Sequence, residues 1–208
     1  MPNVFIPVLE EIGLITEVGA WVLKKACADA VRWPGDAKIA VNLSPMQFKS
    51  HRLGLDVIAA LASSRLPAQR LELEITETAM LQDAATTLAI LGELKALGAS
   101  ISLDDFGTGY SSLSYLQKFP FDKIKIDQSF VREISDTDES MAVVRAVMGL
   151  GSSLGIATIA EGVETADQLR TLRAEGCLVA QGFLFSPAVP ATEIGKLLER
   201  LHRDLDAA

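Results

Sequence analysis

Residues 100–113 read SISLDDFGTGYSSL, and this stretch decides the fold that the sequence predicts. Ile101 and Leu103 alternate with small polar residues, which indicates a short buried strand. The strand ends on two adjacent carboxylates, Asp104 and Asp105, and a loop with two glycines follows. Because the carboxyl ends of parallel strands carry the ligand-binding loops of α/β folds, we expect a functional site at this strand end.

The adjacent carboxylates also predict a bound cation. Two neighbouring negative charges repel each other unless a cation or a shared proton compensates them. Mg²⁺ and Mn²⁺ prefer oxygen ligands, so a hard divalent metal ion is the expected partner of Asp104 and Asp105. The alternative, in which the two residues only cap a helix or form a turn, stays open for this stretch taken alone.

The composition of the 208-residue chain predicts one globular domain over residues 1–208, because 49% of the residues are hydrophobic. The formal net charge of -8 argues against a protein that binds long nucleic acids, which requires a basic surface. A substrate that carries phosphate groups would therefore need metal ions to neutralise it.

The cysteine content and the hydropathy predict a cytoplasmic protein. Cys27 and Cys177 are far apart and lack the spacing of a zinc site, so we expect neither a disulfide framework nor bound zinc. No apolar run approaches the roughly 18 residues of a membrane span. The first residues also lack the pattern of a signal peptide.

Strands and helices are predicted to alternate along the chain. The apolar patterns indicate six strands, at residues 38–43, 71–76, 101–105, 123–127, 156–160 and 178–181. Helical spacing predicts two helices within residues 5–31, broken near residues 13–19, a short turn near 112–116, and helices at 53–64, 83–97, 138–154, 166–175 and 192–205. This order predicts right-handed βαβ crossovers and a parallel sheet, either open or closed into a barrel.

Polar side chains at the strand ends favour the barrel. They are Asn42, Glu74, Asp104, Asp105, Lys125, Asp127, Glu161 and Gln181. Because a closed barrel brings the ends of several strands to one centre and an open sheet does not, we predict a TIM-like (β/α) barrel. Such a barrel has eight strands, so the six indicated strands predict a domain that lacks two N-terminal strands.

Six motifs resemble those of the EAL domain family, the bacterial cyclic di-GMP phosphodiesterases. They are VNLSPMQF, LELEITET, LDDFGTGYSSL, KIKIDQSF, AEGVE and QGFLFS, and the likeness runs from Phe5 to Pro187. The resemblance implies a modified TIM barrel that hydrolyses one phosphodiester of cyclic di-GMP to linear pGpG with Mg²⁺ or Mn²⁺. It also implies a homodimer formed beside the DDFGTGYSSL loop and a role in bacterial signalling.

The resemblance implies a two-metal site as well. One ion would be coordinated by Asn42, Glu74 and Asp104, and Asp104 would bridge to a second ion held with Asp105. Glu161 would act as a metal ligand or a general base, so that Asp105 and Glu161 would both take part in catalysis. Two such ions lower the pKa of a bound water and stabilise the leaving alkoxide.

The remaining assignments by resemblance concern catalysis and support of the site. Lys125 would contact the attacking water or a phosphate oxygen, and Gln181 would steady the metal-bound waters. Glu77 matches the residue that anchors the DDFGTGYSSL loop, and Glu164 matches the second acid of the EGVE motif. Asp127, at the end of KIKID, is a supporting residue.

Structural alternatives accompany these assignments when each residue is taken alone. Asn42 could be a turn residue and Glu77 a charge at a helix N-terminus. Lys125 could be a solvated strand residue, and Glu164 could have only a structural role, in capping a helix or orienting its neighbours.

The sequence departs from the family pattern in one respect that bears on activity. The Glu-Ala-Leu segment, which in the family supplies a metal-binding Glu, is absent. Three explanations stay open: a truncated sequence, a natural degenerate protein, or a protomer completed by a partner chain. The main hypothesis is therefore a cyclic di-GMP phosphodiesterase, and the alternative is a catalytically silent cyclic di-GMP receptor or protein-interaction module.

Overall fold

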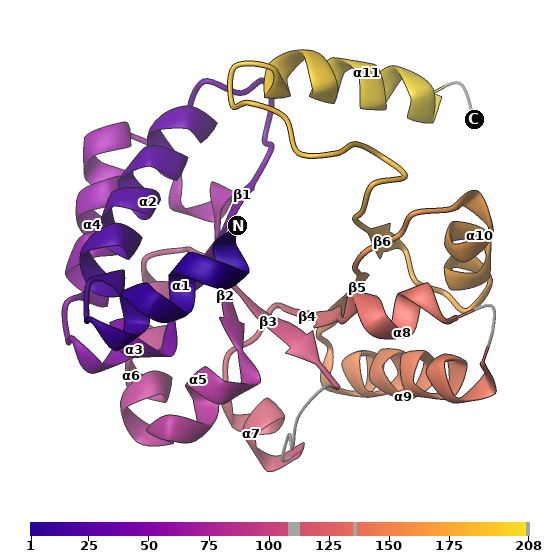
Figure 1. Ribbon diagram of the computed structural model, residues 1–208, viewed down its shortest axis with the longest axis horizontal. Coiled ribbons are helices and arrows are strands. Elements are labelled where there is room, and N and C mark those ends of the chain that lie inside the picture. The colour runs from indigo at the N-terminus through magenta and orange to yellow at the C-terminus, as the bar shows by residue number, and fades with distance from the viewer. Residues whose placement is uncertain (108–112, 135–136, 207–208) are drawn as a thin grey trace. The chain divides into compact units, whose positions relative to one another are not determined.

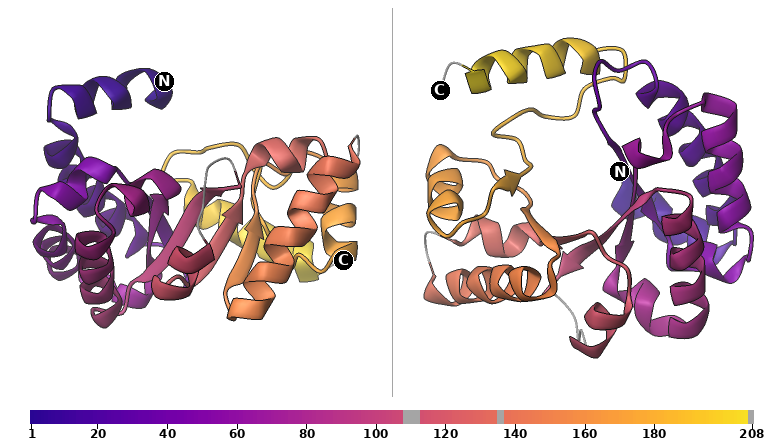
Figure 2. Two further views of the ribbon diagram at one scale, coloured as in Figure 1. Left: turned by 90° about the horizontal axis from the view of Figure 1, so that it is seen from below. Right: turned by 180° about the vertical axis from the view of Figure 1, so that it is seen from behind.

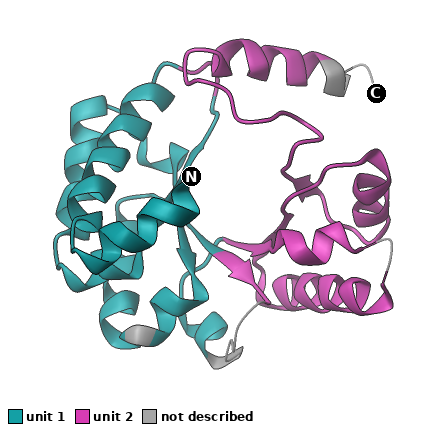
Figure 3. Ribbon diagram, viewed as in Figure 1, with its two compact units in different colours: residues 1–32, 36–103, 111–122 teal, residues 33–35, 104–110, 123–208 magenta. Residues whose placement is uncertain are grey.

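The computed structural model describes residues 1–107, 113–134 and 137–206. Contacts divide the chain into two compact units, which are coloured separately in Figure 3. Unit 1 comprises residues 1–32, 36–103 and 111–122, and unit 2 comprises residues 33–35, 104–110 and 123–208. The strand Ser100–Phe106 therefore contributes residues to both units.

The described strands form a six-stranded sheet in which neighbours follow the chain order (Figure 1). They are β1 (Ile39–Leu43), β2 (Leu71–Thr76), β3 (Ser100–Phe106), β4 (Lys123–Ile126), β5 (Ala157–Ala160) and β6 (Val179–Ala180). The pairs β1–β2, β4–β5 and β5–β6 are parallel. The prediction of an α/β fold with six parallel strands is confirmed.

Unit 1 contains two strands, most of a third, seven α-helices and the short 3-10 helix Ala68–Arg70 among its described residues. The helices are α1 (Pro2–Glu11), α2 (Ile15–Ala30), α3 (Pro45–Lys49), α4 (Leu53–Ser64), α5 (Glu77–Gln82), α6 (Ala84–Ala96) and α7 (Leu113–Lys118). Helices α2 and α4 lie side by side (Figures 1 and 2). Leu23 and Cys27 of α2 and Val57 and Ala60 of α4 are fully buried, because each pair recurs at the spacing of one helical turn.

Strand β2 is buried on both of its faces. Leu71, Leu73 and Ile75 have no solvent exposure, as expected of the alternate positions that face the hydrophobic core. Glu72 and Glu74 occupy the opposite face and are nevertheless only 4% and 6% exposed. Burial on both faces is typical of the strands of parallel sheets and barrels. A buried carboxylate requires compensation by charge or hydrogen bonds. Contact with solvent therefore does not explain the two glutamates on the second face of β2.

Unit 2 contains α8 (Gln128–Arg132), α9 (Asp138–Leu154), α10 (Ala166–Ala174) and α11 (Ile194–Asp206). Helix α9 begins after Thr137, whose hydroxyl accepts a hydrogen bond from the Ser140 amide, and ends at Gly155, which has a φ of +69°. Within α9, Gly151 permits a close approach to β5, because a Cβ there would lie 2.6 Å from Cγ2 of Thr158 and 2.8 Å from the carbonyl oxygen of Ile156, the residue before β5. The predicted bounds of α4 and α9 are confirmed.

The structure differs from the sequence-based expectation at several short elements. The periodicity does not predict α3, α5 and α8, since helices of five or six residues are too short to show a helical repeat. The break between the first two helices covers only residues 12–14, and β6 has two residues rather than four. The expectation of one N-terminally incomplete domain over residues 1–208 stays a prediction.

Two further features bear on the class of protein. Among the described residues, no helix combines the length and the apolar character that crossing a membrane requires. Cys27 and Cys177 are free, buried thiols, and burial raises the pKa of each above its ordinary value. A raised thiol pKa disfavours the thiolate that metal binding and nucleophilic attack require.

Candidate functional site

Three carboxylates gather in unit 2 at the ends of two strands. Asp104 and Asp105 lie in the last residues of β3, and Glu161 directly follows β5. One carboxylate oxygen from each of the three lies within 4.8 Å of the others. Asp104 is only 8% exposed, so the cluster is partly withdrawn from solvent. The donor set matches a hard divalent cation, which takes carboxylate oxygens as ligands.

The backbone at Asp105 explains how two adjacent residues reach one cluster. In a regular strand, adjacent side chains point to opposite faces. Asp105 has a φ of +54°, in the left-handed region that is uncommon for residues other than glycine but is tolerated by Asp. Its amide donates a 3.0 Å hydrogen bond to Oδ1 of Asp104. The left-handed turn interrupts the alternation and allows both carboxylates to approach Glu161.

Lys125 supplies the positive charge of the cluster. This residue of β4 is 3% exposed, which contradicts the alternative of a solvated strand residue. Its Nζ lies 2.9 Å from Oδ1 of Asp104 and 2.5 Å from Oε1 of Glu161. A buried ammonium requires such pairing, because an isolated charge in the interior would be strongly unfavourable. Lys125 therefore bridges two of the three clustered carboxylates.

Gln181 is brought beside Glu161 by backbone pairing that continues beyond β5 and β6. The Gln181 amide donates to the carbonyl of Ala160, and the Val163 amide donates to the carbonyl of Gln181, over 2.9 and 3.0 Å. The side-chain Nε2 of Gln181 then donates a 2.6 Å hydrogen bond to Oε1 of Glu161. The same carboxylate oxygen thus faces both Lys125 and Gln181, and this fixes the orientation of Glu161.

Gly182 is required for this approach, although the sequence reasoning assigned it no role. A Cβ at position 182 would lie 2.2 Å from the carbonyl oxygen and 2.3 Å from the amide nitrogen of Val163. Real Cβ atoms do not approach backbone atoms so closely, so the two loops could not pair with any other residue there. In the sequence, the only indication of this role is that Gly182 directly follows Gln181, a predicted site residue.

The pKa of the Asp105 carboxyl is raised above its ordinary value. The largest cause is partial burial, followed by the negative charges of Asp104 and Asp127 and a hydrogen bond with Asp127, while the charge of Lys125 acts in the opposite direction. A carboxyl with a raised pKa is held among groups that disfavour its negative charge. A bound cation would relieve that repulsion.

Asp127 and Glu164 have local structural contacts. Oδ1 of Asp127 accepts a 2.9 Å hydrogen bond from the Ser129 amide and thereby caps α8. Glu164 is exposed, and its amide donates to Oε1 of Gln168 in the cap of α10. Glu164, with Glu161 and Gln181, also lines a cavity of about 300 Å³ in unit 2. Support of the site by Asp127 and Glu164 stays a prediction.

Asn42, Glu74 and Glu77 lie in unit 1. Asn42 of β1 and Glu74 of β2 are register partners in the parallel ladder, so their side chains share one face. Asn42 is exposed, whereas Glu74 is 6% exposed. Glu77 begins α5 and is also 6% exposed. The part of the DDFGTGYSSL loop at residues 108–112, which Glu77 is predicted to anchor, lies outside the described residues.

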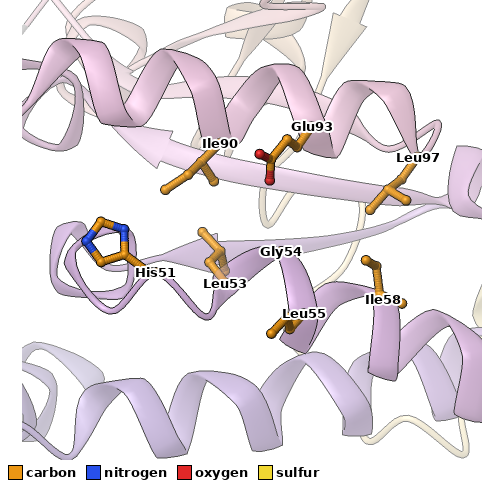
Figure 4. Close-up of a pocket in the computed structure, with 8 residues that line it drawn as sticks. All are labelled: His51, Leu53, Gly54, Leu55, Ile58, Ile90, Glu93 and Leu97. Carbon is orange, nitrogen blue, oxygen red and sulfur yellow. The ribbon is translucent and has the colours of Figure 1, made fainter.

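A separate cavity of about 370 Å³ lies in unit 1 between α4 and α6 (Figure 4). Its lining is largely apolar and includes Leu53, Leu55, Ile58, Ile90 and Leu97. None of the predicted site residues lines it.

Known proteins resemble this chain over most of its length. The family model described as the EAL domain matches residues 1–188. Protein y4lL of Sinorhizobium fredii is 51% identical over 198 residues, which cover 95% of this chain and 24% of y4lL. This chain therefore spans about a quarter of the length of that relative.

Solved structures give the same result for the fold. The PaMucR phosphodiesterase, in a complex with cyclic di-GMP, superposes with a TM-score of 0.89 at 42% identity, over 93% of this chain and 80% of the other. BlrP1 of Klebsiella pneumoniae, in a complex with manganese and cyclic di-GMP, superposes with a TM-score of 0.73 at 33% identity, over 83% and 44%. These likenesses confirm the prediction of an EAL-type, TIM-like fold.

Proposed function

Because this chain belongs to the EAL domain family, we propose that it hydrolyses one phosphodiester bond of cyclic di-GMP and releases linear pGpG. The observation that supports this most strongly is the cluster of Asp104, Asp105 and Glu161, with oxygens within 4.8 Å of one another. The net charge of the chain is -8, so an anionic substrate needs a compensating cation at such a cluster.

The chain's own residues would hold that cation. Asp104, Asp105 and Glu161 offer carboxylate oxygens, the ligand type that Mg²⁺ and Mn²⁺ prefer. We propose Asn42 and Glu74, which share one face of the β1–β2 ladder in unit 1, as further oxygen ligands for divalent metal. Bound divalent ions supply an activated water and neutralise phosphate oxygens.

The remaining residues would position the reacting groups and neutralise negative charge. The Lys125 ammonium group lies against Asp104 and Glu161, and it would contact a phosphate oxygen or the attacking water. Glu161 is oriented by two donors on the same oxygen, which suits it to act as a metal ligand or a general base. Gln181 would act mainly by fixing Glu161, a role supported by their 2.6 Å hydrogen bond.

The test is incubation of the chain with cyclic di-GMP and Mn²⁺, followed by chromatography of pGpG. The Asp104→Asn variant should lose roughly 100-fold or more in rate, since loss of outer partners of a metal site alone costs about 10–100-fold. Asp167→Asn is the matched control, because Asp167 is exposed on α10 and its carboxylate pairs with the neighbouring, exposed Arg170. Its rate should equal that of the parent chain.

Two outcomes would contradict the proposal in different ways. Calorimetric binding of cyclic di-GMP without any pGpG, in the presence of Mn²⁺, would favour the receptor alternative. Equal rates for Asp104→Asn and the parent chain would show that the carboxylate cluster does not take part in the reaction. Light scattering of the same sample would test the proposed homodimer.

A further inference from the structure

The loop after β1 contains a reciprocal hydrogen-bonded cap. Ser44 precedes α3, and its hydroxyl oxygen accepts a 3.2 Å hydrogen bond from the Met46 amide. In return, the Ser44 amide donates a 3.0 Å hydrogen bond to Oε1 of Gln47. Such a capping box satisfies amide groups at the start of a helix that would otherwise lack partners. The backbone of residues 44–47 is therefore fixed directly after the strand that carries Asn42.

Helix α1 contributes a charged partner to this cap. The Ser44 hydroxyl donates a 2.6 Å hydrogen bond to Oε1 of Glu10, which lies 34 residues earlier in the chain. Hydrogen bonds to a carboxylate are shorter and stronger than neutral ones. Because the hydroxyl has one proton, donation to Glu10 leaves the oxygen lone pairs to accept from Met46. Glu10 thus sets the direction of the hydroxyl that caps α3.

Helix α2 supports the cap from a second direction. Gln47 is 3% exposed, and a Cβ at Gly19 of α2 would lie 2.3 Å from its Nε2 atom. The side-chain carboxamide of Gln47 is therefore packed tightly against α2, while its Oε1 accepts the hydrogen bond from the Ser44 backbone amide. Residues of α1 and α2 together hold the end of β1 in place.

We propose that Glu10 is a positioning residue for Asn42, acting through the Ser44 cap. The Asn42 side chain is exposed, so its place depends mainly on the backbone that carries it. Ser44 lies two residues after Asn42, and Glu10 is the charged group that fixes its hydroxyl. This inference rests on the proposed function in one respect, namely that Asn42 is a metal ligand.

The test compares variants of the whole 208-residue chain. Mn²⁺ affinity is measured by electron paramagnetic resonance, and amide exchange of Met46 by nuclear magnetic resonance, for Glu10→Ala, Ser44→Ala and the double variant. Glu11→Ala is the matched control, because Glu11 is the exposed neighbour on the same helix. Glu10→Gln keeps an acceptor for the Ser44 hydroxyl and tests rescue.

Glu10→Ala should weaken Mn²⁺ binding roughly tenfold, the effect of losing an outer partner of a metal site. Met46 should exchange faster, and Glu10→Gln should restore both properties toward those of the parent. The double variant should bind Mn²⁺ no more weakly than Ser44→Ala alone, because the two residues act as one unit. Glu11→Ala should match the parent in both measurements.

The inference is overturned if Glu10→Ala and Glu11→Ala bind Mn²⁺ equally well, even where Met46 exchanges faster, because the cap would then not position Asn42. It is also overturned if the effects of Glu10→Ala and Ser44→Ala simply add. Loss of Mn²⁺ affinity in Glu10→Ala together with no pGpG from the parent chain would refute the proposed function alone. The two failures are thus distinguishable.

Discussion

Replacement of Lys125 by Met removes the buried positive charge of the carboxylate cluster. Met has a similar length and fills the same space, so the change isolates the loss of charge. Lys125 is 3% exposed and contacts Asp104 at 2.9 Å and Glu161 at 2.5 Å. After the substitution, three carboxylates would remain within 4.8 Å of one another without the ammonium group of Lys125.

The magnitude follows from Coulomb's law. Two unit charges 4.8 Å apart repel by about 3 kcal/mol at an effective dielectric constant of about 20. Loss of one partner of a buried ion pair has a separately known cost of about 3–5 kcal/mol, because the remaining charge is left buried and uncompensated. We therefore expect Lys125→Met to lower the free energy of unfolding by about 3 kcal/mol when no metal is present. For a chain of this length the melting temperature should fall by roughly 6–12 °C.

The assay is urea unfolding at pH 7, first with EDTA and then with Mn²⁺. Lys25→Met is the control, because Lys25 forms an exposed ion pair with Asp29 at 2.7 Å within α2. Exposed pairs of this kind contribute about 0.5 kcal/mol or less. Mn²⁺ should stabilise Lys125→Met more than it stabilises the parent, since the cation replaces the missing charge.

Two results would refute this reasoning. One is an Lys125→Met chain as stable in EDTA as Lys25→Met, which would mean that the clustered carboxylates do not repel each other. The other is a loss of stability that Mn²⁺ does not reduce, which would separate the cluster from metal binding.

Two further substitutions test the loop pairing and a helix cap. Gly182→Ala should weaken Mn²⁺ binding roughly tenfold, because a Cβ would collide with the Val163 backbone. The control Gly151→Ala, also tightly packed in unit 2, should change stability and leave Mn²⁺ affinity unchanged. Calorimetry with Mn²⁺ would decide, and equal Mn²⁺ affinities of the two variants would exclude an effect of the Gly182 loop. Asp83→Ala should destabilise the chain at pH 7 and progressively less toward pH 3 in thermal melts. A hydrogen bond from Thr86 lowers the folded-state pKa of Asp83, so the stabilisation is present above the ordinary carboxyl pKa and is lost as the pH falls through the lowered value. A loss of stability that does not depend on pH would contradict this origin.

Much of the fold was predictable because its signals are local. The bounds of α9 coincide with Thr137, which caps its start, and Gly155, which follows its end, and both residue types are helix-boundary signals in the sequence. The alternation in LELEIT identifies β2 and the face that carries Glu74. Short helices such as α3 were not predictable, because five residues show no helical period.

The candidate site likewise has features that the sequence predicted and features that it did not. Placement of Asp104, Lys125 and Glu161 at strand ends is a matter of counting residues in a strand, and the sequence alone identified them. The left-handed conformation of Asp105 and the close approach of Gly182 to Val163 depend on contacts between segments that local patterns do not encode.

By itself, then, the sequence determined the order of strands and helices, the polar strand ends and the family motifs, because these depend on neighbouring residues and on their period. Only the tertiary structure decided that Lys125 is buried between Asp104 and Glu161, that Gln181 orients Glu161, and that Glu10 reaches Ser44. These contacts join residues 20 to 36 positions apart in the sequence. Their free energies depend on burial and distance, which exist only once the chain has folded.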